Sequence, residues 1–195
     1  MAGFTRSARV GCWFSLPAGD GVVDLARNIE IKARLADFQS QYELAQALSG
    51  SAGELIHQLD IFFHCKQGRL KLRVFDDGHG ELIHYQRPSD SGPKLSDYVI
   101  SRSQDSETLR EALARAYGIK AIVEKDRLLF MCGRTRVHLD RVKNLGSFLE
   151  LEVVLEDHED ASVGYREAET LMADLGVDRE SLVDCAYVDL ISGAH

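Results

Sequence analysis

The sequence predicts an α+β fold in which an antiparallel sheet has one apolar face and one charged face, with helices packed on the apolar face. Apolar and polar residues alternate along several short segments, as they do in strands with one buried face. Other segments repeat apolar residues every three or four positions, which indicates amphipathic helices. Short turns rich in glycine and aspartate join neighbouring strand segments at the spacing of hairpins.

The first half of the chain is expected to hold four strands and one helix. The first strand covers Asn28 to Leu35, where isoleucine, alanine and leucine occupy alternate positions. A helix begins at Asp37 and ends at Ser49-Gly50-Ser51. Three further strands are predicted at His57 to Cys65, Arg69 to Phe75 and Glu81 to Arg87. The turn-rich segment Ser89 to Pro93 is expected to be a mobile loop.

The second half is expected to contain a meander of strands between helices. Ser103 or Asp105 can cap a helix that stops at Gly118. Strands then fill Ile119 to Leu155, with predicted breaks near Asp126, near Gly133 and at Asn144 to Ser147. The remaining predictions are helices at Ser162 to Leu175 and around Glu180 to Cys185, and a last strand at Ala186 to Ile191.

Composition favours one globular domain without a general affinity for nucleic acid or membranes. The 195 residues carry 23 Lys+Arg against 31 Asp+Glu, so any bound phosphate needs a local cluster of cations. No apolar run reaches the ~20 residues of a spanning helix. The 4 cysteines lie far apart without a C-x-x-C motif, so a cytoplasmic protein is expected. Residues 1–24 are interpreted as an N-terminal extension, a poor signal peptide that could instead be a transit segment or a loose leader.

Like charges recur two residues apart along the predicted strands, and this spacing puts them on one face. Lys71 with Arg73 and Lys125 with Arg127 are purely cationic pairs, whereas Glu150 with Glu152 is purely anionic. Such pairs repel unless an opposite charge lies between them, which suits a polyphosphate beside the cations and a hard divalent ion beside the carboxylates. A solvated outer face is the plain alternative. Alternation alone does not distinguish an open sheet from a closed barrel with a watery interior.

An ordered series of motifs resembles the CYTH family, named for CyaB adenylyl cyclases and thiamine triphosphatase and also called triphosphate tunnel metalloenzymes. The resemblance covers about Leu25 to Ile191, and residues 25–195 are assigned to this domain. Its most specific pieces are N-I-E-I-K-A-R-L at 28–35, Q-L-D-I-F-F at 58–63, G-R-L-K-L-R at 68–73, E-L-I-H-Y-Q-R at 81–87, E-K-D-R at 124–127, R-V-H-L-D-R-V at 136–142 and L-G-S-F-L-E-L-E at 145–152.

The resemblance implies a closed antiparallel tunnel of eight strands, with helices packed outside, that binds a triphosphate and Mg²⁺ or Mn²⁺. By position, the implied metal ligands are Glu30, Asp140, Glu150 and Glu152. The implied phosphate contacts are Lys32, Lys71, Arg73, Arg87, Lys125, Arg127 and Arg136. Glu30, Lys32, Glu150 and Glu152 are implied to be catalytic. The family signature E-x-E-x-K is altered, because Asn28 stands in place of its first glutamate, and this puts a second metal ion in doubt.

Three functions remain open. A metal-dependent triphosphatase is favoured over an adenylyl cyclase that forms cyclic AMP and pyrophosphate. Hydrolysis requires only that the triphosphate be bound, whereas cyclisation also requires a pocket for the base, which the sequence does not locate. A binding module without turnover is the third. The expected ligands are ATP, thiamine triphosphate or tripolyphosphate, and a homodimer is left open. His138 shares the parity of Arg136 and Asp140, and a hydrogen-bonded structural role is expected for it rather than a catalytic one.

Overall fold

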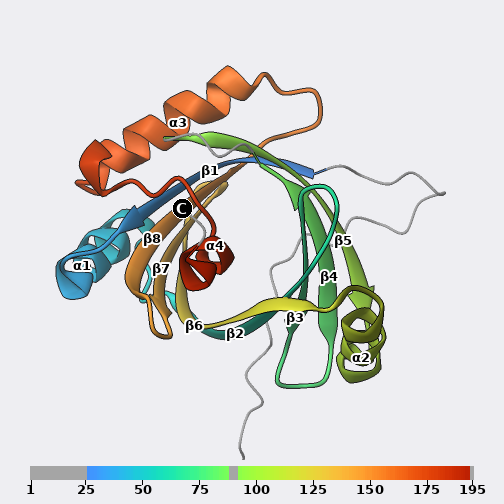
Figure 1. The fold of residues 1–195 in the computed structure, drawn as a ribbon. Coiled ribbons are helices and arrows are strands. Elements are labelled where there is room, and N and C mark those ends of the chain that lie inside the picture. The colour runs from blue at the N-terminus through green and yellow to red at the C-terminus, as the bar shows by residue number, and fades with distance from the viewer. Residues whose placement is uncertain (1–25, 88–91, 194–195) are drawn as a thin grey trace, which may run out of the picture.

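Eight antiparallel strands close into a barrel in this computed structural model, which describes residues 26–87 and 92–193. The strand order around the barrel is β1-β5-β4-β3-β2-β6-β7-β8 (Figure 1). The strands are β1 (Ala26–Arg34), β2 (Glu54–Phe63), β3 (Arg69–Val74), β4 (Gly80–Gln86), β5 (Lys94–Ser103), β6 (Ile119–Cys132), β7 (Thr135–Val142) and β8 (Gly146–Val154). The closed barrel implied by the family resemblance is therefore confirmed.

Aspartates begin the three longer helices, which are α1 (Phe38–Ser49), α2 (Ser106–Tyr117) and α3 (Ala161–Asp174). The Asp37 carboxylate accepts hydrogen bonds from the backbone N–H groups at the start of α1, as Asp105 and Asp160 do for α2 and α3. Gly50 ends α1 with φ of 67°, a left-handed conformation that glycine adopts without strain. The helix boundaries predicted at Asp37, Asp105 and Gly50 are confirmed.

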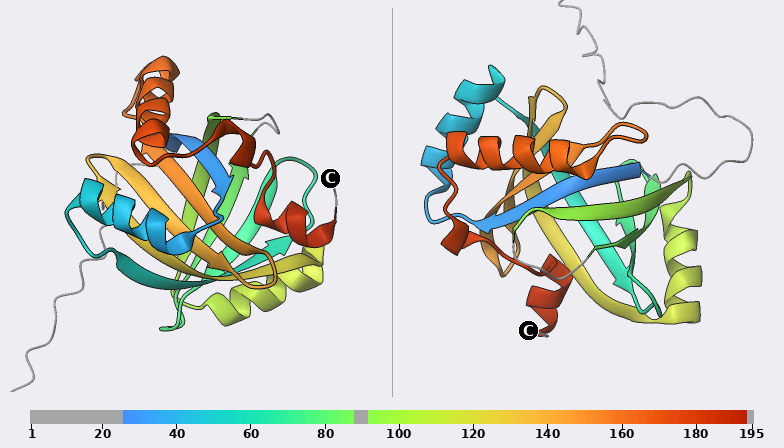
Figure 2. Two further views of the ribbon diagram at one scale, coloured as in Figure 1. Left: turned by 90° about the vertical axis from the view of Figure 1, so that its left-hand side faces the viewer. Right: turned by 90° about the horizontal axis from the view of Figure 1, so that it is seen from above.

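The apolar core lies outside the barrel wall, between the strands and the helices. Outward-facing residues such as Ile29, Leu139 and Leu151 are fully buried and share one cluster with side chains of α1 and α3. A separate cluster around Ile61 and Leu72 includes residues of α2. Figure 2 shows the helices arranged around the outside of the barrel in this way. Because this wall is covered by helices, the opposite face of each strand is the one turned inward.

Four sequence predictions of secondary structure are wrong. Around Glu180 to Cys185, where a short helix was predicted, the structure has only a 3₁₀ turn at Arg179–Ser181. Strand β5 was not predicted, because polar Asp97 and Ser101 stand at its outward positions while Tyr98 and Ile100 stand at inward ones, so no apolar alternation is visible. Strand β6 runs unbroken through Asp126, whose exposed side chain faces outward. The last segment is not a strand but the helix α4 (Tyr187–Ser192), because a closed barrel offers no free edge for another strand. The loop predicted at Ser89 to Pro93 falls mostly on residues 88–91, outside the described ranges.

Helix α4 lies across one opening of the barrel (Figure 1). It follows a single 3₁₀ turn (Arg179–Ser181) and a segment whose Val183 N–H donates to the backbone carbonyl of Lys32 in β1. Tyr187 and Val188 are buried in a cluster with inward-facing residues that include Phe62 and Phe148. The C-terminal segment therefore closes this end of the interior. Within the described ranges, no helix combines the length and apolar character that crossing a membrane would need.

Candidate functional site

All eight strands contribute polar or charged side chains to the barrel interior. The cations are Lys32, Lys71, Arg73, Arg87, Lys94, Lys125, Arg127 and Arg136. The carboxylates are Glu30, Asp60, Glu81, Asp140, Glu150 and Glu152. Every site residue predicted from the sequence is thus inside one enclosure, and the cations outnumber the carboxylates.

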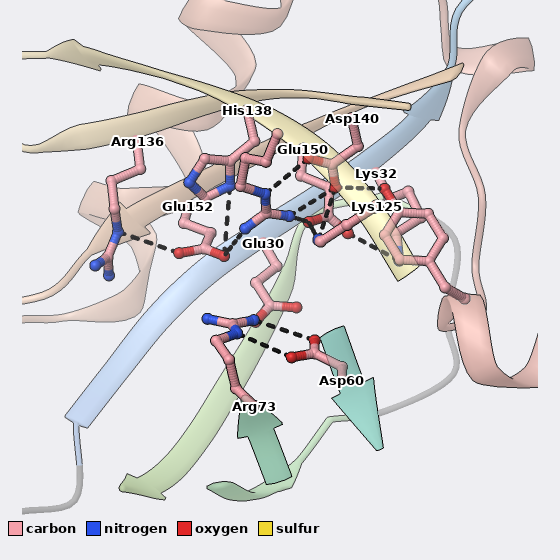
Figure 3. A network of polar contacts seen from close by, with 12 residues as sticks. Glu30, Lys32, Asp60, Arg73, Lys125, Arg136, His138, Asp140, Glu150 and Glu152 are labelled. Carbon is pink, nitrogen blue, oxygen red and sulfur yellow. Dashed lines mark hydrogen bonds and ion pairs between the residues drawn. The ribbon is translucent and has the colours of Figure 1, made fainter. Parts of the chain in front are cut away.

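Asp140 of β7 is the centre of a fully buried network (Figure 3). Its carboxylate accepts hydrogen bonds from Lys125 Nζ at 2.8 Å, from Arg127 Nε and Nη2 at 2.7 Å each, and from Tyr187 Oη at 3.0 Å. Burial opposes ionisation, but the charges of Arg127 and Lys125 outweigh it and hold the pKa of Asp140 well below its usual range. In this structure Asp140 fixes the two cations of β6 in position.

Glu150 and Glu152 of β8 lie next to this network on the inner face of the barrel. Lys32 Nζ is 2.9 Å from a Glu150 oxygen, and Arg127 also pairs with Glu150. Arg136 Nε lies 3.1 Å from the Glu152 carboxylate. Burial alone would raise the pKa of Glu152, but interactions with His138 and Arg136 lower it to about 2. Burial also opposes ionisation of Glu150, but the charges of Lys32 and Lys125 hold its pKa well below its usual range, so both glutamates are ionised at neutral pH.

His138 lies beside the two glutamates and provides a nitrogen atom. Potential ligand atoms of His138, Glu150 and Glu152 all lie within 4.8 Å of one another. Burial, and next the charge of Arg127, lower the pKa of His138 to about 3, so the imidazole is neutral and keeps a lone pair. Two carboxylates and a neutral imidazole are a suitable donor set for a divalent metal ion. Glu30 and Asp140, implied as ligands by the resemblance, do not belong to this compact group.

The opposite wall of the interior holds a second set of paired cations. Asp60 accepts from Lys71 Nζ at 2.7 Å and from Arg73 Nε at 2.9 Å, as expected for an aspartate facing tunnel cations. Glu30 accepts from Arg87 Nη1 at 2.6 Å. Cations from β3 and β6, and Arg87 directly after β4, thus face the interior from different sides, in an arrangement suited to surround a chain of phosphates.

Sequence reasoning missed two residues at the closed end of the tunnel. Lys94 Nζ donates to the backbone carbonyl of Asp184 at 2.5 Å, and the Tyr187 ring lies 3.8 Å from Lys32 Nζ. Lys94 and Ser96 are two residues apart in β5 and so lie on the same face of the strand. This spacing was a weak signal for an interior position, because the strand itself was not predicted. Tyr187 gave no signal, because only the closure of the barrel by α4 brings it to Asp140.

Two interior lysines have lowered pKa values, which predicts that binding of a triphosphate in the barrel would depend on pH. Burial and the charge of Arg73 lower the pKa of Lys71 to about 8, while burial and Arg87 lower that of Lys94 to about 8. A bound polyanion favours the charged lysines and raises both pKa values, so binding should take up protons at pH 8.5 and weaken as the pH rises further. Titration calorimetry with tripolyphosphate, in buffers of different ionisation enthalpy, measures this uptake.

The double variant Lys71→Arg and Lys94→Arg is the matched control, because arginine stays charged throughout this range. It should bind tripolyphosphate at pH 8.5 with little proton uptake. Equal uptake by the wild type and the variant would contradict the assignment to these lysines.

The fold and its interior define a closed-barrel protein with a tunnel of opposed charges, and comparison with known proteins agrees. The chain belongs to the CYTH family, because the CYTH domain model matches residues 26–187. The protein named Putative adenylate cyclase MJ0240, from Methanocaldococcus jannaschii, is 22% identical over 170 residues, covering 83% of this chain and 97% of that one.

Solved structures share the fold at low identity. The PH1012 protein of Pyrococcus horikoshii matches with a TM-score of 0.74 and 21% identity, over 84% of this chain and 98% of its own. HpAC1 from Hippeastrum matches with a TM-score of 0.61 and 15% identity, over 85% of this chain and 96% of its own. These structures show the same fold, and the CYTH domain model that matches residues 26–187 confirms the family resemblance found in the sequence.

Proposed function

We propose that the protein is a divalent-metal-dependent triphosphatase that hydrolyses a triphosphate held inside its barrel. The observation that carries this proposal is the pairing, in one enclosure, of an excess of buried cations with the group formed by His138, Glu150 and Glu152. Such cations neutralise a polyanion that water would otherwise solvate. Two paired carboxylates with a free imidazole lone pair suit the divalent ion on which triphosphate chemistry depends.

In this reaction water attacks the terminal phosphorus, and the bond to the oxygen that bridges to the next phosphorus breaks. Phosphate and the shortened phosphate chain leave, and the water gives up a proton. Arg73, Lys125 and Arg127 would stabilise the charge that builds up on the phosphate oxygens. Glu150 and Glu152 would hold the metal ion, with Lys32 and Glu30 at the reacting end. The bound ion would supply Lewis-acid polarisation of the phosphate oxygens and activation of water.

Adenylyl cyclase activity is the second candidate, because the Methanocaldococcus jannaschii relative carries that name. In cyclisation the ribose 3′-hydroxyl attacks the α-phosphorus of ATP and displaces pyrophosphate. Hydrolysis is favoured because it requires only the grip on phosphates that the interior provides. HpAC1, which shares the fold, is described as revealing a dominant triphosphatase activity. A module that binds without turnover would follow if the uncharged Asn28 had removed an essential ligand.

A panel of tripolyphosphate, ATP and thiamine triphosphate, each with Mg²⁺ or Mn²⁺ and with all products identified, tests the proposal. Release of inorganic phosphate that requires the metal is the expected result. Cyclic AMP with an equal amount of pyrophosphate would establish a cyclase instead. Measurable binding of all three compounds without any product would establish a binding module.

A further inference from the structure

His138 carries a buried nitrogen atom to which no described residue is hydrogen-bonded. The residue lies in β7 opposite Glu150 of β8, is only 3% exposed, and its side chain turns into the tunnel. Its Nδ1 has no hydrogen-bond partner among the described residues. A buried polar atom without a hydrogen bond lowers the stability of the folded protein. Native proteins rarely contain such an atom unless it has a function or binds another group. The structural, hydrogen-bonded role expected from the sequence is therefore not seen at this atom.

The nearest candidate partner of Nδ1 is a carboxylate that is itself suited to bind metal. Nδ1 lies 3.7 Å from Glu152 Oε1, too far for a hydrogen bond. Two ligand atoms each about 2.1 Å from one ion lie roughly 3.0 to 4.2 Å apart, depending on the angle between them. The observed separation falls within this range, and Glu150 completes the group. The separation is compatible with an ion between the two side chains and too long for a direct hydrogen bond.

Imidazole and carboxylate differ in the metals that they favour. Oxygen ligands suit Mg²⁺, which dehydrates reluctantly, whereas an imidazole nitrogen raises affinity for transition ions. Asn28 gives the interior one negative charge fewer than the family signature E-x-E-x-K would, which weakens purely electrostatic binding of Mg²⁺ further.

We propose that His138 Nδ1 is a metal ligand, together with Glu150 and Glu152, and that this mixed nitrogen and oxygen site selects Mn²⁺ over Mg²⁺. The inference rests on the proposed function only in placing a divalent ion in the tunnel. It concerns the identity of the ligands and of the ion, so it can be tested without turnover.

Pulsed electron paramagnetic resonance of the wild-type protein with Mn²⁺ alone gives the first test. Coupling to a ¹⁴N nucleus of the strength of a directly bound imidazole is the expected signal, and it should disappear in His138→Asn. Absence of this coupling in the wild type, once Mn²⁺ is bound, would overturn the proposal. Because this measurement uses the wild-type protein, it tests whether His138 binds the metal even if a variant fails to fold.

Titration calorimetry gives the second test. We expect Mn²⁺ to bind the wild type at least about tenfold more tightly than Mg²⁺. His138→Asn should lose about tenfold or more in Mn²⁺ affinity with a smaller change for Mg²⁺, and His138→Asp should shift the preference towards Mg²⁺. His57→Asn is the matched control, because His57 is exposed and pairs with Asp126 outside the tunnel, and it should bind both ions as the wild type does.

Unchanged Mn²⁺ affinity in His138→Asn would overturn the proposal. Failure of the proposed function would look different, because the protein would then bind Mn²⁺ through nitrogen and yet hydrolyse no triphosphate.

Discussion

Replacing Glu152 by glutamine is expected to lower metal-dependent triphosphate hydrolysis by about 10²- to 10³-fold. Glutamine has nearly the same shape as glutamate, but it lacks the negative charge that pairs with Arg136 at 3.1 Å and that would bind the metal ion. The loss should appear mainly in kcat at saturating substrate, together with weaker binding of Mn²⁺. Phosphate release and Mn²⁺ titration measure the two effects separately.

Glu124→Gln is the control for this variant. Glu124 lies on the outer side of β6, where it pairs with Lys143 in contact with solvent. The substitution removes the same charge from the protein without touching the tunnel, so activity should stay within about twofold of wild type, as is usual for surface changes. Full activity in Glu152→Gln would show that the carboxylate does not hold the metal.

The charged interior could be predicted because strand geometry fixes which residues share a face. Lys71 with Arg73 and Lys125 with Arg127 follow the two-residue period, and the repulsion within each pair indicated an opposite charge nearby. The structure supplies that charge as Asp60 for the first pair and Asp140 for the second. Local periodicity was sufficient for this part of the site.

The partners of each charge could not be predicted, because they depend on contacts between strands distant in sequence. Strand β1 pairs with both β5 and β8, which places Lys32 opposite Glu150. Nothing near Lys32 in the sequence specifies that neighbour. The position of Tyr187 could not be predicted either. The apolar alternation of 186–191 is typical of a strand, but the closed barrel has no free edge at which another strand could pair. For His138, the sequence does not show whether a buried histidine finds a hydrogen bond at each ring nitrogen, so its structural role stays a prediction.

Asp140→Asn is expected to lower the free energy of unfolding by about 3 to 5 kcal/mol, the usual effect of removing one partner from a buried ion pair. Lys125 and Arg127 both direct their charges at this carboxylate and are almost fully buried themselves. Asparagine would remove the carboxylate that both buried cations contact most closely, leaving Glu150 as their remaining shared counter-charge. The amide NH₂ group of asparagine would also face the N–H groups of these cations. Urea denaturation measures the loss.

Asp126→Asn is the matched control, because Asp126 lies on the exposed face of β6 with 59% of its side chain accessible. Its removal should change the free energy of unfolding by less than about 0.5 kcal/mol. If Asp140→Asn were as stable as wild type and lost Mn²⁺ binding instead, Asp140 would be a metal ligand, as the family resemblance implies.

A polyanion should compensate for part of the missing charge in Asp140→Asn. Lys125 and Arg127 would then have one carboxylate partner fewer and should bind phosphate oxygens more strongly. Tripolyphosphate should therefore raise the melting temperature of the variant more than that of the wild type. Sodium chloride at equal ionic strength controls for screening. A larger rescue by tripolyphosphate than by salt would show that the cations held by Asp140 are the ones that contact the phosphate chain. Equal rescue would assign Asp140 and its two partners a purely structural role.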